Sequence, residues 1–143
     1  MTVAAILKHK GIDIASVSPA TTVAAVASLL SSRRIGAVLV LDQAETLMGI
    51  VSERDIIHGL ASSGAGALEK TAEQVMTHAV KTATPRTTVS EAMAIMTSGR
   101  FRHLPVIEHG ALVGIVSIGD IVKARMMQQE HEVDSLKAYV AGG

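Results

Sequence analysis

Residues 114–120, Gly-Ile-Val-Ser-Ile-Gly-Asp, repeat the pattern of residues 49–55, Gly-Ile-Val-Ser-Glu-Arg-Asp. The β-branched pair after each first glycine favours an extended strand. A serine followed three residues later by an aspartate is typical of the first turn of a helix. Each copy therefore predicts a strand that runs directly into a helix. At such a junction the serine hydroxyl, free backbone N–H groups and the aspartate carboxylate lie close together, which suits a polar ligand.

These two copies belong to a longer internal repeat. A shift of 66 residues aligns Pro19 with Pro85 and Arg34 with Arg100, and a shift of 65 aligns the two glycine-led stretches. A repeat of this length, present twice, predicts two similar halves that bury their apolar faces together about a pseudo-twofold axis. We place the first repeat at residues 1–66 and the second at residues 67–143, with residues 64–66 as the linker.

Hydrophobic periodicity predicts the same order of elements in both repeats: strand, helix, strand, strand, helix, preceded by one short helix. Thr22 and Thr88 are the expected N-caps of the first long helices, and Glu91 completes a capping box with Thr88. The remaining expected elements are short helices at residues 3–8 and 72–76 and hairpins that pair 37–41 with 47–51 and 103–107 with 112–116.

Apolar residues continue beyond Asp120 at helical spacing. They follow one another at intervals of four, seven, three and four residues, with Gln129 in the long gap: Val122, Met126, Val133, Leu136 and Val140. This stripe is longer than one repeat needs. We expect it to cover a partner subunit, and the alternative is that it packs back on its own domain.

Composition excludes several classes of function. Thirteen basic residues balance thirteen acidic ones, and Phe101 and Tyr139 are the only aromatic residues. Net charge therefore does not favour binding to a nucleic acid or an anionic membrane. The sequence also lacks the row of aromatic rings on which the bases of a single strand could stack. With no cysteine, and no histidine pair at i, i+4, no metal site is expected. The absence of a leader or a long apolar run predicts a cytoplasmic protein. The sequence shows no nucleophile paired with a base and no phosphate-binding loop, so no enzymatic activity is expected.

The repeat, the glycine-led stretches and residues 102–106, Arg-His-Leu-Pro-Val, resemble a tandem pair of cystathionine-β-synthase (CBS) domains, also called a Bateman module. The resemblance implies an α/β (α+β) fold in which two βαββα repeats pack sheet to sheet and leave two clefts for adenosyl ligands. It implies a regulatory module that binds an adenine nucleotide between the repeats, forms a homodimer and signals to an unidentified protein. AMP is the first expectation, with ADP, ATP or NAD(H) as alternatives. A structural dimerisation module without nucleotide is the other function we consider.

The resemblance also implies the site residues. It assigns the ribose to Asp55 and Asp120, beside Ser52 and Ser117; a carboxylate can accept hydrogen bonds from both hydroxyls of a ribose diol. It places adenine against the start of each central strand and the turn before the first long helix of each repeat. These positions are Ile35, Gly36 and Ala37 with Ser16, and Phe101, Arg102, His103 and Leu104 with Thr82.

Phosphate requires cations, and guanidinium groups suit it best. The cationic or titratable residues next to these motifs are Arg34, Arg54, Arg100, Arg102 and His103. Ile118 and Gly119 replace Glu53 and Arg54 in the second copy, and Leu39 stands where the second repeat has Pro105. We therefore expect the two sites to be inequivalent.

Overall fold

The computed structural model describes residues 1–11, 13–78 and 80–142, which form two compact units. The first-repeat unit is Asp13–Val80, and the second-repeat unit combines Met1–Ile12 with Lys81–Gly143. The predicted repeat boundary between residues 66 and 67 therefore does not coincide with the division into compact units. The two differ because the short helix before each repeat packs with the other repeat: α1 (Val3–Lys10) contacts a strand of the second repeat, and α4 (Ala72–Val75) contacts elements of the first.

The first-repeat unit has the predicted order of strand, helix, strand, strand, helix. Its elements are β1 (Ser16–Val17), α2 (Val23–Arg33), β2 (Ala37–Leu41), β3 (Leu47–Ser52) and α3 (Glu53–Ser63). In its three-stranded sheet, β2 pairs in parallel with β1 and antiparallel with β3. The apolar faces of α2 and α3 pack on this sheet, and Val26, Val38 and Val51 are fully buried in the resulting core.

The linker expected at residues 64–66 is part of a helical turn within the first-repeat unit. A 3-10 helix, η1 (Gly64–Glu69), follows α3 and contacts both α2 and α3. Ala67 is completely buried in it. The glycines signalled the end of α3 correctly, but burial of the small Ala67 side chain keeps the next turn attached to the same unit.

The second-repeat unit consists of α1, α5 (Val89–Gly99), β4 (His103–Glu108), β5 (Ala111–Ser117) and α6 (Ile118–Gly142). The hairpin β4–β5 is antiparallel. The predicted first strand of this repeat is reduced, among the described residues, to one parallel bridge between Ala83 and Val106. Beyond Ala83 the backbone turns, because the Thr84 N–H donates to the Thr87 hydroxyl at 2.9 Å.

Two equivalent glycines of the repeat, Gly49 and Gly114, allow close packing in their units. A Cβ atom added at Gly49 would lie 2.7 Å from the Thr77 carbonyl oxygen and 2.7 Å from the Met76 sulfur. A Cβ at Gly114 would meet the end of the Leu7 side chain, also at 2.7 Å. In each unit, a segment from before a repeat therefore packs directly on this glycine. Leu7 of α1 packs on Gly114 of β5, and Met76 and Thr77, which follow α4, pack on Gly49 of β3.

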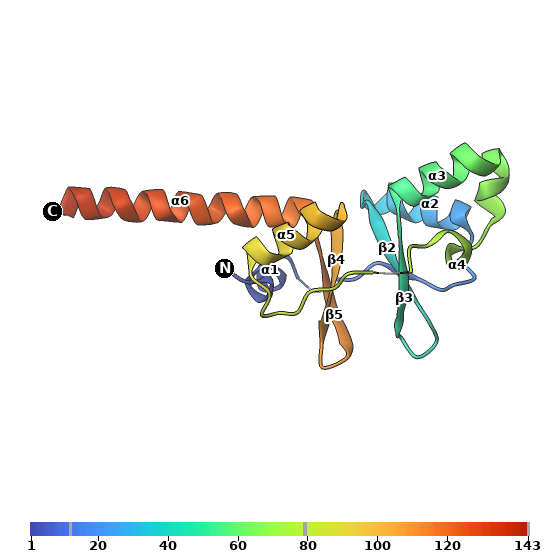
Figure 1. The fold of residues 1–143 in the computed structure, drawn as a ribbon, viewed down its shortest axis with the longest axis horizontal. Coiled ribbons are helices and arrows are strands. Elements are labelled where there is room, and N and C mark those ends of the chain that lie inside the picture. Colours follow the sequence, from blue (N-terminus) through green and yellow to red (C-terminus); the bar gives the residue numbers. More distant parts are fainter. Residues whose placement is uncertain (12, 79, 143) are drawn as a thin grey trace. The chain divides into compact units, whose positions relative to one another are not determined.

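The last helix, α6, has two faces of different character. Ile121 and Ala124 are buried against its own unit, whereas the predicted apolar stripe is exposed along the whole helix. Figure 1 shows α6 continuing well beyond α1 and α5, with which its first turns pack. The prediction of a long helix is confirmed. Across the described residues, no helix combines the length and the apolar character needed to cross a membrane.

We predict that Gly49→Ala destabilises the protein more than Gly114→Ala. The Thr77 carbonyl is backbone and cannot yield without moving the strand bridge, whereas the Leu7 side chain can change rotamer. A cost of about 1 to 3 kcal/mol is expected at Gly49 and less at Gly114, measured by urea unfolding. Equal losses in the two variants would show that backbone contact at Gly49 is not the limiting constraint.

Candidate functional site

In the first-repeat unit, Ser52 and Asp55 form a reciprocal cap at the junction of β3 and α3. The Ser52 N–H donates to Asp55 Oδ2 at 2.8 Å, and the Asp55 N–H donates to Ser52 Oγ at 3.3 Å. The Ser52 hydroxyl also donates to Oδ2. The other carboxylate oxygen, Oδ1, accepts a hydrogen bond of 3.2 Å from the Thr77 hydroxyl. The half-buried carboxylate is thus oriented by its own helix and by one neutral group from a distant segment.

The start of the central strand lies beside this junction. Ala37 pairs in register with Ser52, and the Gly36 carbonyl accepts a hydrogen bond of 3.0 Å from the Glu53 N–H. Strand start, strand end and helix start therefore meet at one point. The structure brings together Gly36, Ala37, Ser52 and Asp55, four of the candidate site residues. Gly36 has no side chain and is half-buried, whereas Ala37 is buried, so a flat group could approach the backbone here only at Gly36.

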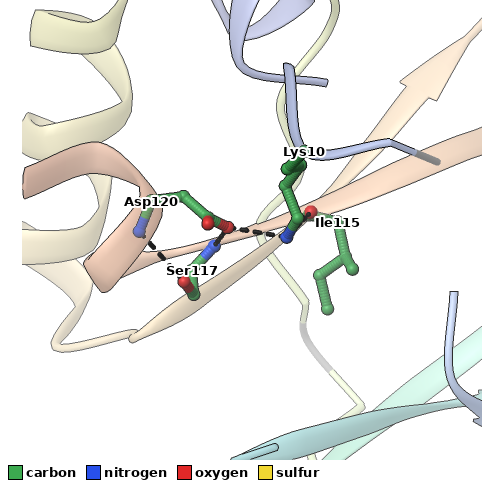
Figure 2. Close-up of polar contacts among 4 residues, drawn as sticks. All are labelled: Lys10, Ile115, Ser117 and Asp120. Atoms are coloured by element: carbon green, nitrogen blue, oxygen red, sulfur yellow. Dashed lines mark hydrogen bonds and ion pairs between the residues drawn. The ribbon is translucent and has the colours of Figure 1, made fainter. Parts of the chain in front are cut away.

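The second-repeat unit contains an equivalent junction, with a different partner. The Ser117 N–H donates to Asp120 Oδ2 at 2.8 Å, and the Asp120 N–H donates to Ser117 Oγ at 3.1 Å. Lys10 Nζ, from the end of α1, also donates to Asp120 Oδ2, at 2.7 Å, and to the Ile115 carbonyl at 3.0 Å (Figure 2). Lys10 therefore links β5, through the Ile115 carbonyl, to the start of α6, through the Asp120 carboxylate.

The Lys10–Asp120 ion pair is partly shielded from water, with side-chain exposures of 33% and 23%. Burial of Asp120 acts to raise its pKa, but the hydrogen bond from Lys10, the backbone N–H of Ser117 and the positive charge of Lys10 together lower the pKa below its ordinary value of 3.8. Asp120 is accordingly ionised at neutral pH and already has a cationic partner.

The strand start of the second-repeat unit repeats the geometry of the first with larger side chains. His103 pairs in register with Ser117, and the Arg102 carbonyl accepts a hydrogen bond of 2.7 Å from the Ile118 N–H. Arg102 is exposed and His103 is half-buried. Leu104, which the sequence analysis assigned to adenine, is completely buried in the core of the unit. Its side chain packs against other core residues, so only its backbone could contact a ligand.

Other predicted residues lie in two open grooves, one in each unit. The groove of about 550 Å³ in the first-repeat unit is lined by Ala27, Leu30, Ser31, Arg34, Ile35, Glu53, Ile56 and Ile57. The groove of about 490 Å³ in the second-repeat unit is lined by Lys81, Thr82, Ala94, Ile95, Ser98, Gly99 and Phe101. Asp55 and Asp120 line neither of them. Arg34 and Ile35 thus share a groove with Glu53, the residue that follows Ser52, whereas the groove of Thr82 and Phe101 is lined by no residue from Ser117 to Asp120.

Ser16 lies on β1, and it lines neither groove. It is aligned with Leu39 in the parallel pairing of β1 with β2, two residues along β2 from Ala37. Its side chain is exposed. Thr82 occupies the corresponding place one residue before the bridge at Ala83, and it is also exposed. Each of these two residues therefore lies beside the central strand of its own unit.

The four candidate arginines are exposed, and in residues 1–11, 13–78 and 80–142 none of them has an ion-pair partner. Arg34 and Arg100 end α2 and α5 in the left-handed backbone conformation, with φ of 54° and 56°. This conformation is unfavourable for a residue with a Cβ atom and is usually taken by glycine. The geometry at both positions holds the arginine backbone at a helix end next to a strand start.

Sequence reasoning missed Lys10 and Thr77, which contact the two carboxylates. No local signal could have found Lys10, because it lies 110 positions before Asp120 in the chain. The described part of the chain contains no group of three or more His, Cys, Asp or Glu side chains placed to hold a metal ion.

Two small sheets covered by helices, with a capped strand-to-helix junction repeated in each unit, define a tandem-repeat α+β protein. The CBS domain family pattern matches residues 3–62 and 72–127. The CBS-domain protein ATU1752 from Agrobacterium tumefaciens has a TM-score of 0.85 and 42% identity, and the match covers 87% of this chain and 92% of that one. The chain belongs to the CBS-domain family, with two copies of the domain in tandem.

Two further comparisons bear on function. The mitochondrial CBS domain-containing protein CBSX3 of Arabidopsis thaliana is 36% identical over 118 residues; the match covers 80% of this chain, which spans 57% of that protein. The CBS domain protein PAE2072 from Pyrobaculum aerophilum, solved in complex with AMP, has a TM-score of 0.74 and 25% identity, with coverage of 84% of this chain and 89% of that one.

We predict that Lys10→Met lowers the free energy of unfolding at pH 7 by about 0.5 to 1 kcal/mol, the range for partly exposed ion pairs. Since the pKa of Asp120 is lowered by folding, its contribution is complete above 3.8 and is lost as the pH falls through the folded-state value. The difference from wild type should therefore shrink at acidic pH. Lys8→Met is the matched control on the same helix, and an identical pH profile for both variants would contradict the role of Lys10.

Proposed function

We propose that this CBS pair is a regulatory module that binds an adenine nucleotide at its two strand-to-helix junctions, acts as a homodimer and signals to a partner protein. The observation that carries the proposal is the carboxylate held beside the strand start in both units, by Asp55 and Asp120. The AMP complex of the related PAE2072 supports the choice of AMP as the first ligand to test. ADP, ATP and NAD(H) share the same adenosine group and are the alternatives.

The chemistry of Asp55 suits a ribose diol. A ligand with two adjacent hydroxyls donates two hydrogen bonds to a carboxylate, which has acceptor sites beyond those its cap uses. The Thr77 hydroxyl bond to Oδ1 is neutral and 3.2 Å long, so a ligand hydroxyl can replace it at small cost. An aspartate in the first turn also offsets the positive end of the helix, which favours a neutral diol over a phosphate at this point.

Asp120 is the weaker of the two sites on this view. Its Oδ2 atom is bound by the Lys10 ammonium at 2.7 Å, and a neutral hydroxyl gains less by displacing a cation than by displacing another hydroxyl. The diol is therefore expected at Asp55 first. The Lys10 ammonium also bonds to the Ile115 carbonyl, so it links β5 and the start of α6.

The phosphate groups are assigned to the exposed arginines near the strand starts. Arg54 follows Ser52 on α3, and Arg102 precedes the half-buried His103 on β4. A guanidinium without an ion-pair partner is free to form a bidentate contact with phosphate. We propose no catalytic step, because the two junctions offer acceptors and caps without a nucleophile aimed at a reacting atom.

We predict that Asp55→Ala weakens AMP binding by about ten- to a hundred-fold, equivalent to roughly 1.5 to 3 kcal/mol for charge-assisted bonds to a diol. Asp120→Ala should weaken it less, because Lys10 already occupies that carboxylate. Isothermal titration calorimetry is the measurement. Glu91→Ala is the matched control, since it removes the carboxylate of the α5 capping box and loses a cap alone. Unchanged AMP affinity in both aspartate variants would reject nucleotide binding at the junctions and favour a purely structural module.

We also predict that AMP binds more tightly than adenosine by about ten- to a hundred-fold, the range for a charged hydrogen bond to phosphate. Arg54→Ala, in the same unit as Asp55, should remove most of this preference and leave adenosine binding unchanged. Arg86→Ala is the control, because Arg86 is exposed and pairs with Glu108 at 3.7 Å. Equal affinity of the wild type for AMP and adenosine at both low and high salt would show that these arginines do not contact phosphate.

A further inference from the structure

The apolar stripe of α6 is exposed although it is as regular as a core face. The exposed fractions are 46% for Val122, 57% for Met126, 50% for Val133, 63% for Leu136 and 70% for Val140. The helix already uses another face, that of Ile121 and Ala124, to pack on its own unit. At 3.6 residues per turn the two faces lie roughly 120° apart around the helix. The stripe is therefore directed away from the contact of α6 with its own unit.

The spacing along the stripe is that of a coiled coil. With Gln129 included, the positions Val122, Met126, Gln129, Val133, Leu136 and Val140 follow one another at intervals of 4, 3, 4, 3 and 4. This alternation is the heptad pattern, in which Met126, Val133 and Val140 take the a positions and the other three take the d positions. Val133 and Val140 at a, with Leu136 at d, match the pattern of parallel two-stranded coiled coils, and Gln129 places one polar residue in the seam at a d position.

The charges beside the stripe distinguish the two possible orientations. In a parallel pair, each g residue lies near the e residue five positions later on the other helix. Arg125 would then face Glu130 of the second copy, and Glu132 would face Lys137. In an antiparallel pair with the stripes fully overlapped, Glu130 would face Glu130, Glu132 would face Glu132 and Lys123 would face Lys137. Opposite charges meet in the first arrangement and like charges in the second.

We propose that residues 122–140 of α6 form a parallel, two-stranded coiled coil with a second copy of this chain. This extends the homodimer part of the proposed function by naming its surface, and it does not depend on nucleotide binding. Ile121 and Ala124 hold the start of α6 in helical form on its own unit, so part of the ordering cost of association is met before the two copies meet.

Cysteine cross-linking tests the orientation, because the chain contains no cysteine of its own. Val140→Cys places the single thiol at an a position, where a parallel pair brings the two copies of that residue together. Ala138→Cys, at an outward f position, is the matched control. Under mild oxidation we expect the disulfide dimer to form at least ten times faster for Val140→Cys, measured by non-reducing electrophoresis. Equal rates would overturn the proposal, since antiparallel helices or a dimer formed elsewhere would not join residue 140 to itself.

Charge exchange tests the pairing. Glu132→Lys should raise the dimer dissociation constant at least ten-fold in sedimentation velocity, and adding Lys137→Glu should restore the dimer. Asp134→Lys makes the same charge change at an outward b position and should have little effect. Circular dichroism and AMP titration on each variant distinguish a lost interface from misfolding or a lost ligand site. A dimer unaffected by Glu132→Lys, or not restored by the second exchange, would overturn the proposed interface.

Discussion

The hydrogen bond from a serine N–H to an aspartate carboxylate, 2.8 Å long in both units, is the interaction on which the arrangement of each unit depends. It joins the last residue of a strand to the first turn of a helix. A backbone bond from the first helical N–H to the start of the neighbouring strand completes the junction, through Gly36 in one unit and Arg102 in the other. Three chain segments are thereby held at one point, and the side chains around it are oriented before any ligand arrives.

The same carboxylate therefore serves both the fold and the proposed ligand site, and the two units differ in what else it binds. Asp55 accepts a hydrogen bond from the neutral Thr77, and Asp120 accepts one from the charged Lys10. These partners come from the segments that precede the repeats and pack across them. Part of the asymmetry between the junctions thus arises from chain outside the repeated motif.

The fold could be predicted where the signal is local. Caps such as Thr88 with Glu91, and the hairpin of residues 103–107 with 112–116, depend on neighbours a few positions apart, and the structure has them within a residue or two. The 3-10 helix that includes residues 64–66 could not be predicted from the sequence, because burial of Ala67 depends on tertiary packing of η1 on α2 and α3. The first strand of the second repeat was overestimated for a similar reason, since pairing at Ala83 depends on the partner strand as well as on its own sequence.

The sequence by itself determined that two copies of a capped strand-to-helix junction exist, with Ser52 and Asp55 in the first; that Gly36 and Ala37 lie beside it came from the strand pairing. Periodicity and capping are short-range properties, so they can be seen without the fold. It also determined that α6 is a long helix with an apolar stripe. Tertiary structure alone decided that Lys10 binds Asp120 and that Leu104 is in the core, because these contacts depend on chain segments that are distant in sequence. It also decided that α1 packs with the second repeat, since Gly114 leaves just enough space for the Leu7 side chain above the strand.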